Sequence, residues 1–157
     1  MKKLLFILVA VLFTVTACEK AMYVDGTYKA TFADFDSHGW NTFLEFTLTE
    51  DMVSDVDFDY LDSTGNRKST DAGYQERMKA YSYVLVDGDT VRIGPADYTP
   101  EINANVASAT INPSFTGIDA VAGATHSVEN ADALMEVILE AALTGESMIL
   151  TPPLPVE

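Results

Sequence analysis

Several residue types that often mark function are scarce in this chain of 157 residues. Cysteine occurs once, as Cys18, so no disulfide can form within the chain. Lysine and arginine together number 9, against 24 aspartate and glutamate residues, which gives a formal net charge of −15. Nucleic-acid binding depends on basic side chains that neutralise phosphates, so this balance argues against a nucleic-acid partner.

Recognisable metal and hydrolase patterns are also missing. Histidine occurs only at His38 and His126, and no serine lies in a nucleophile elbow. Asp55, Asp57 and Asp59 alternate along one stretch, which is typical of an acidic strand face rather than of a calcium loop. The sequence therefore predicts neither a metal site nor a hydrolase site.

The apolar run near the N-terminus is short. Residues 4–13 are too few for a membrane-spanning helix. Lys2 and Lys3 precede the run, which is the charge order of a secretory signal peptide. We therefore expect a signal peptide over residues 1–17 and an extracytoplasmic location.

The segment Val-Thr-Ala-Cys at residues 15–18 has the pattern of a lipobox, where cleavage precedes a cysteine that carries lipid. An unpaired thiol in an exported protein requires an explanation, and lipid on Cys18 supplies one. Two or more acyl chains, such as palmitate, anchor a protein stably to a membrane. We expect residues 18–22 to be the lipidated cysteine and a short tether to a bacterial membrane.

Strand patterns occur in five stretches, which alternate apolar and polar side chains or are rich in β-branched and aromatic residues. They are residues 27–32, 43–49, 53–60, 83–86 and 90–93. The short turns between the second and third stretches, and between the fourth and fifth, predict two antiparallel hairpins. Residues 81–85 are equally compatible with a continued helix.

A first helix is expected after Thr70 or Asp71, either of which can cap it. Tyr74, Met78 and Tyr81 then share one helical face. Further on, glycine and proline in residues 94–101 predict a break in regular structure. Residues 102–111 are compatible with a helix or a strand.

A second helix is expected beyond Thr125, ending at Gly145. Its apolar stripe comprises Val128, Ala131, Leu134, Met135, Ile138, Leu139 and Ala142. Three prolines then follow, so residues 147–157 are expected to form a loose or surface-laid tail.

Small residues dominate positions 118–127, just before this helix. They expose backbone amide groups at the positive end of the helix dipole and leave the hydroxyl of Thr125 beside it. This arrangement favours a phosphate. An ordinary loop-to-helix junction, capped by Ser127, explains the local pattern equally well.

Asp119, Gly123, Ala124 and Thr125, followed by Ser127, resemble the flavinylation motif of the FMN-binding domain family. That family includes peripheral flavin subunits of ion-pumping NADH:quinone oxidoreductases and many small bacterial lipoproteins. In it, the last threonine of the motif can carry FMN through a phosphoester bond that a flavin transferase installs. The resemblance therefore implies FMN attached to Thr125.

The resemblance extends over most of the mature chain. The matching segments are residues 25–28, 43–60, 68–78 and 95–100. It implies an α+β fold, in which a twisted antiparallel sheet of hairpins packs with two or three helices. A single FMN-binding domain is expected over residues 23–146.

The same resemblance suggests roles around the motif. Asp119 would orient the loop or assist the transferase, or it would simply be a turn-forming carboxylate. Gly123 and Ala124 would give backbone access, and Ser127 would cap the helix. His126 would contact the phosphate, since imidazolium attracts anions, or it would remain solvated.

An isoalloxazine ring requires a flat apolar contact and hydrogen bonds to its pyrimidine side. Trp40, Tyr74, Met78 and Tyr98 are the candidates for the contact, although Tyr74 and Met78 have the spacing of core residues. Lys68 is the candidate to balance the negative charge that accumulates near N1 on reduction.

The expected protein is thus a lipid-anchored flavoprotein that relays electrons between a membrane donor and an external acceptor. It would be a carrier rather than a complete enzyme. Two alternatives stay open: a flavin-free lipoprotein that binds another ligand or partner, and the redox module of a reductase. The first is favoured by Ala122, which stands where the motif usually has serine or threonine.

Overall fold

The computed structural model describes residues 21–145 and 148–154. The predicted signal peptide and Cys18 lie outside these residues. The elements in chain order are β1 (Gly26–Thr31), β2 (Asn41–Thr49), β3 (Met52–Leu61), the 3₁₀ helix η1 (Lys68–Thr70), α1 (Ala72–Tyr81), β4 (Tyr83–Val86), β5 (Asp89–Arg92), α2 (Pro95–Ala107), α3 (Thr125–Thr144) and β6 (Ile149–Leu150).

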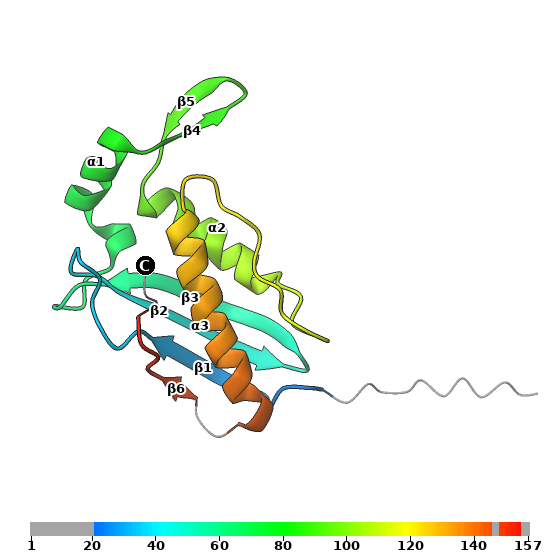
Figure 1. Ribbon diagram of the computed structural model, residues 1–157. Coiled ribbons are helices and arrows are strands. Elements are labelled where there is room, and N and C mark those ends of the chain that lie inside the picture. Colours follow the sequence, from blue (N-terminus) through cyan, green and yellow to red (C-terminus); the bar gives the residue numbers. More distant parts are fainter. Residues whose placement is uncertain (1–20, 146–147, 155–157) are drawn as a thin grey trace, which may run out of the picture.

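A twisted four-stranded sheet, in the order β3-β2-β1-β6, forms the base of the domain (Figure 1). Helices α2 and α3 cover one of its faces, α2 along β3 and α3 along β1 and β2. The predicted α+β class and both predicted hairpins are confirmed. In the part of the chain that the structure describes, no helix has the length and hydropathy to cross a bilayer.

Alternation along the strands builds the core. Tyr28 pairs with Phe46, and Leu44 with Phe58, so these four side chains lie on the face beneath the helices, where all are buried. On the opposite face, Lys29 pairs with Glu45 in an exposed ion pair of 3.3 Å. This alternation is the period-two pattern expected of strands with one face in the core.

The acidic strand face differs from the prediction at Asp59, which is only 1% exposed. Residues 67–69 fold over this part of the outer sheet face, and the hydroxyl of Ser69 donates to Asp59 Oδ2 at 2.5 Å. Arg67 lies over the ring of Phe43 nearby. Asp59 is therefore a buried structural carboxylate, because a later segment covers it.

Helix α1 begins as expected, with the Asp71 side chain accepting a hydrogen bond from the backbone of Tyr74 at 2.8 Å. The predicted break over residues 94–101 is wrong, because α2 starts at Pro95. Proline is tolerated there, since the first helical N–H needs no partner. The Asp97 carboxylate accepts from the backbone N–H of Gly94 at 2.8 Å and completes the helix start.

Helix α3 ends at Gly145, which has a left-handed φ of 68°, as expected. The described part of the tail, residues 148–154, is not loose, however. Residues Ile149–Leu150 form β6, which pairs in parallel with β1, and the Pro152 carbonyl accepts from the N–H of Ala33 at 2.8 Å. The described part of the tail therefore belongs to the domain, beyond the predicted boundary at residue 146.

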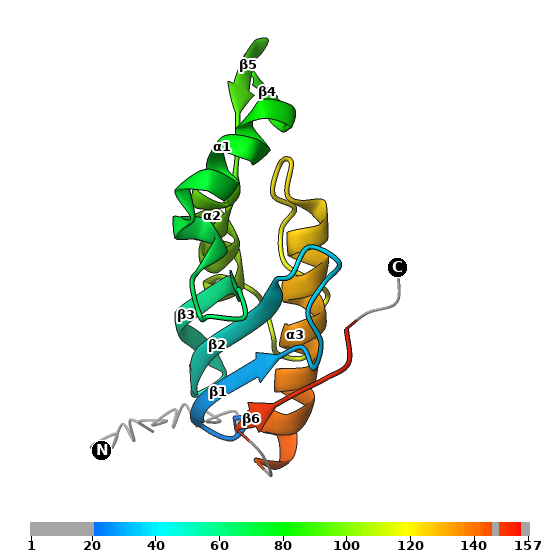
Figure 2. The ribbon, with the colours of Figure 1, turned by 90° about the vertical axis from the view of Figure 1, so that its left-hand side faces the viewer.

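Helix α1 and the β4–β5 hairpin form an arm that projects from the sheet and its two covering helices (Figure 2). No residue of α1 is buried. At its base, the hairpin contacts the loop that precedes α3, as described below. The position of the arm therefore affects the loop that precedes α3, which is part of the candidate site.

Candidate functional site

A cavity of about 700 Å³ lies between α1, the loop after β1, the N-terminal half of α2 and the first turns of α3. It is lined by Asp36, His38, Tyr60, Lys68, Tyr74, Met78, Tyr98, Gly123, Ala124, Thr125, His126, Ser127, Glu129, Asn130, Ala133 and Leu154. Most of the predicted site residues, which are far apart in the sequence, thus line one cavity. Trp40 and Asp119 are the exceptions.

Thr125 is the first residue of α3, and its side chain is exposed at the cavity. Ala124 occupies the N-cap position and supplies no side-chain cap. The first helical hydrogen bond runs from Val128 to the Ala124 carbonyl. Within the described residues, the N–H groups of Thr125, His126 and Ser127 find no acceptor, so this helix start favours an anion.

Ser127 does not cap the helix, contrary to the prediction. It is the third helical residue and is 7% exposed. Its hydroxyl oxygen accepts a hydrogen bond from the Tyr60 hydroxyl at 2.8 Å, and Asn130 donates to the same Tyr60 oxygen at 3.4 Å. Because α3 begins at Thr125, Ser127 lies within the first helical turn and not at the cap position.

Tyr60 was missed as a site residue, because its strand pattern indicated only a core position. Burial raises its pKa, which keeps the phenol protonated as the donor to Ser127. The only sequence signal was a phenol on a strand, and a phenol usually finds a hydrogen-bond partner when buried.

Gly123 is required by geometry. Its φ is 73°, a conformation that side chains with a β-carbon rarely adopt. A β-carbon there would collide with Ile93 Cδ1 and lie 3.2 Å from Val84 Cγ1. The base of the β4–β5 hairpin thus packs directly on the motif backbone.

The loop before Gly123 is held from two helices. Asp132 of α3 accepts from the N–H of Ile118 at 2.9 Å, and Asn105 of α2 donates to the Asp119 carbonyl at 3.0 Å. Burial raises the pKa of Asp132. The carboxylate of Asp119 is exposed and does not line the cavity, so its predicted role toward a transferase stays a prediction.

His126 lies at the rim, with its side chain 91% exposed and Nδ1 3.1 Å from Glu129 Oε2. The other histidine, His38, lines the same cavity from the loop after β1. Both histidines of the chain therefore border this site, although only His126 was predicted to do so.

Aromatic side chains form the walls. Tyr74 and Met78 project from α1, and Tyr98 comes from α2. Burial raises the pKa of Tyr98, so this phenol is neutral. Trp40 does not line the cavity; it is 6% exposed and packs edge-on behind Tyr74, with ring centroids 5.3 Å apart. The structure therefore does not place Trp40 where its predicted contact with a ligand ring could form.

Among the described residues, Lys68 is the one buried lysine, at 7% exposure. Its Nζ lies 4.1 Å from the ring centroid of Tyr60, 4.8 Å from that of Tyr74 and 5.6 Å from that of Trp40. Burial lowers its pKa, while Asp36 and Asp59 act in the opposite direction. The ammonium group therefore sits in an aromatic cage at the cavity.

No protein-family model matches the chain. The Clostridium perfringens protein CPE2226, whose crystal structure is known, shares the fold at a TM-score of 0.70 and 25% identity, covering 85% of this chain and 100% of that chain. The 15 kDa lipoprotein of Treponema pallidum (strain Nichols) is 35% identical over 130 residues, which are 83% of this chain and 84% of that protein. The chain therefore belongs to the family of this treponemal 15 kDa lipoprotein.

Proposed function

We propose that this protein is a lipid-anchored, extracytoplasmic flavoprotein that carries FMN on Thr125. The observation that supports this most is an exposed threonine hydroxyl at a helix start with free N–H groups, beside a cavity with aromatic walls. Such a site accommodates a ligand in which a short chain joins a phosphate to an aromatic ring system.

The residues present fit FMN. A volume of about 700 Å³ lies within the usual range for a small-molecule site. Aromatic and apolar side chains form part of its walls, and polar groups also line it, among them the hydroxyl of Ser127 and the ammonium of Lys68. Such a combination is typical of cofactor sites.

The backbone and side chains that line the cavity have separate roles in this proposal. The N–H groups at the start of α3 bind the phosphate, and Gly123 lets the backbone approach it. Tyr74 and Tyr98 exclude water from the ring system. Bound FMN would supply one- and two-electron redox chemistry, and the fold would set its potential and its access to partners.

Covalent attachment would need the hydroxyl of Thr125, FAD and a transferase. The threonine oxygen forms the new phosphoester bond to the FMN phosphorus and releases its proton, the pyrophosphate bond of FAD breaks, and AMP leaves. The exposed position of Thr125 supports this reaction, because a separate enzyme must reach the hydroxyl.

Membership in a lipoprotein family supports lipid attachment at Cys18. The proposed partners are accordingly a flavin transferase during maturation, the membrane through the lipid, and a membrane electron donor. An acceptor outside the membrane completes the relay.

Intact-mass measurement after co-expression with a flavin transferase tests the attachment. The mature chain should gain the mass of FMN less one water, and its denatured gel band should fluoresce. Thr125→Ala should lose both signals. Thr116→Ala is the matched control, since Thr116 is an exposed threonine of the preceding loop.

A flavin adduct that persists on Thr125→Ala would contradict attachment at this residue. No adduct and no reversible FMN binding by the wild type would favour a flavin-free binding lipoprotein. Steady-state turnover with a small acceptor, without a partner protein, would instead indicate a reductase module.

A further inference from the structure

The buried cation of Lys68 has an unusual environment. Among the described residues, its Nζ makes no hydrogen bond or ion pair, and three aromatic rings have their centroids 4.1 to 5.6 Å from it. A buried ammonium group without a carboxylate partner is costly, since ring faces replace only part of its hydration. Such a group therefore suggests a negatively charged ligand group in the adjoining cavity.

Asp36 and Asp59, the two carboxylates that raise the pKa of Lys68, have other hydrogen-bond donors. Asp59 accepts hydrogen bonds from Ser69 and lies 3.7 Å from Arg67 Nη1. Asp36 Oδ1 accepts from the backbone N–H groups of His38 and Trp40, at 2.8 and 2.9 Å. Both carboxylates therefore already accept hydrogen bonds from groups other than Lys68.

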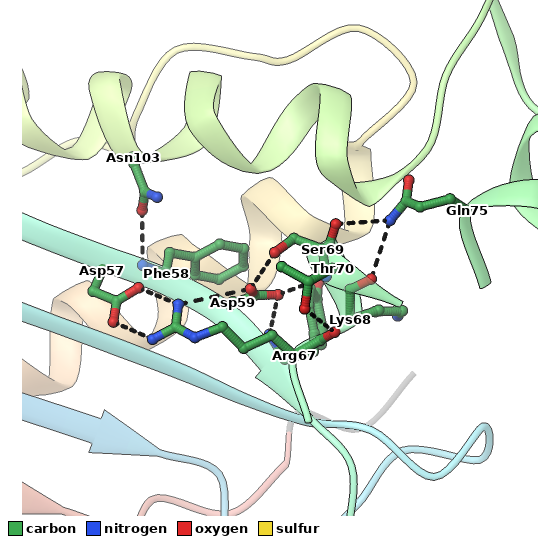
Figure 3. Close-up of polar contacts among 10 residues, drawn as sticks. Asp57, Phe58, Asp59, Arg67, Lys68, Ser69, Thr70, Gln75 and Asn103 are labelled. Atoms are coloured by element: carbon green, nitrogen blue, oxygen red, sulfur yellow. Dashed lines mark hydrogen bonds and ion pairs between the residues drawn. The ribbon is translucent and has the colours of Figure 1, made fainter. Parts of the chain in front are cut away.

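The backbone of Lys68 is also held firmly (Figure 3). Gln75 of α1 donates to the carbonyl groups of Lys68 and Ser69, at 3.0 and 3.2 Å. On the other side, Arg67 forms two hydrogen bonds to Asp57, at 2.7 and 2.6 Å. In Figure 3 the Lys68 side chain points away from this polar cluster. The segment therefore presents a preorganised cation to the cavity.

We infer that Lys68 forms an anion subsite in the cavity and makes the site bind two-electron-reduced FMN more tightly than oxidised FMN. This inference rests on the proposed function. Reduction of FMN by two electrons with uptake of one proton adds one negative charge to the ring system. The fixed ammonium group attracts that added charge, while oxidised FMN offers it only carbonyl oxygens.

The test uses the full chain in detergent, expressed without a flavin transferase so that Thr125 is unmodified. Fluorescence quenching gives the Kd for oxidised FMN. The midpoint potential of bound FMN relative to free FMN, titrated with dithionite, gives the ratio of the oxidised to the reduced Kd. Because the phosphate contacts are common to both states, this ratio isolates the ring environment. Riboflavin, which lacks the phosphate, should give the same ratio.

The wild type should bind reduced FMN at least tenfold more tightly than oxidised FMN. Lys68→Met should lower this preference about tenfold, which equals a fall in potential of about 30 mV for a two-electron couple. Lys68→Arg should keep most of it. Lys29→Met removes the same charge from the outer sheet face, where Lys29 pairs with Glu45, and should leave the ratio unchanged.

An unchanged ratio in Lys68→Met, or an equal loss in Lys29→Met, would overturn the inference while the proposed function stands. A failure of the wild type to bind FMN in either state would overturn both. If Lys68→Met does not fold, a tenfold lower preference in Lys68→Arg would also contradict the inference, because the charge is retained there.

Discussion

Replacement of Gly123 by alanine should destabilise the protein and disturb the site together. The residue has φ of 73°, and a β-carbon would collide with Ile93 Cδ1 and approach Val84 Cγ1 to 3.2 Å. Both partners belong to the arm of β4 and β5 or follow it directly. The substitution therefore forces either the motif loop or the base of the hairpin to move.

The size of the effect follows from two separate costs. A left-handed conformation costs a residue with a β-carbon about 1–2 kcal/mol, and the lower entropy of the unfolded chain returns about 0.4–1 kcal/mol. Overpacking against Ile93 adds about 1–3 kcal/mol. We therefore expect Gly123→Ala to lower the free energy of unfolding by about 2–4 kcal/mol.

Gly65→Ala separates these costs. Gly65 has φ of 87°, and no atom lies within 4 Å of the position that a β-carbon would take, so only the backbone cost applies there. Urea unfolding should give a loss of about 1 kcal/mol for Gly65→Ala. Ile93→Ala removes the colliding atom. In that background, Gly123→Ala should lower the unfolding free energy by about 1 kcal/mol, as Gly65→Ala does.

The reasoning is refuted if Gly123→Ala costs no more than Gly65→Ala, or if Ile93→Ala does not reduce its cost. Flavin incorporation gives a second measurement. Gly123→Ala should lower the yield of the FMN adduct, whereas Gly65→Ala should not, because Gly65 lies outside the cavity lining.

Three further predictions concern single contacts. Hydrogen bonds from Arg67 lower the pKa of Asp57, so this pair stabilises the fold above the unfolded-state pKa of Asp57, and the contribution is lost as the pH falls. Asp57→Asn should therefore lower the unfolding free energy by about 0.5–1 kcal/mol at pH 7 in urea unfolding. Equal costs at pH 7 and pH 2 would contradict this. Tyr60→Phe leaves the buried hydroxyl of Ser127 without its donor and should cost about 1–2 kcal/mol, measured by thermal unfolding; no loss would mean that the bond contributes nothing. Burial lowers the pKa of Lys68, which shows that its charged form is disfavoured in the fold. Lys68→Met removes this cation and should raise the unfolding free energy of the flavin-free protein by about 1 kcal/mol. A decrease would show that the surrounding aromatic rings offset the cost of burial.

Local patterns determined much of the fold. Alternation predicted the strands that contain Tyr28, Phe46 and Phe58, and helical spacing predicted the buried stripe of α3. The helix ends at Asp71 and Gly145 were also predicted, because capping depends on one residue and its immediate neighbours. Such features need no knowledge of distant segments.

Other features depended on contacts between segments far apart in the sequence. Asp59 is buried because residues 67–69 cover it, and the buried hydroxyl of Ser127 accepts a hydrogen bond from Tyr60 on a distant strand. The residues around Trp40 indicate only a polar loop, yet its ring packs edge-on against Tyr74. In each case the partner, rather than the local pattern, decides the outcome.

The sequence by itself predicted the strands β1 to β5, the helices α1 and α3, the glycine before α3 and the candidate threonine. Only the tertiary structure decided that Lys68, Tyr74, Tyr98 and Thr125 surround one cavity, and that the tail adds an edge strand to the sheet. The physical reason is that periodicity and capping are encoded over a few neighbouring residues. A cavity arises only where surfaces from several elements meet.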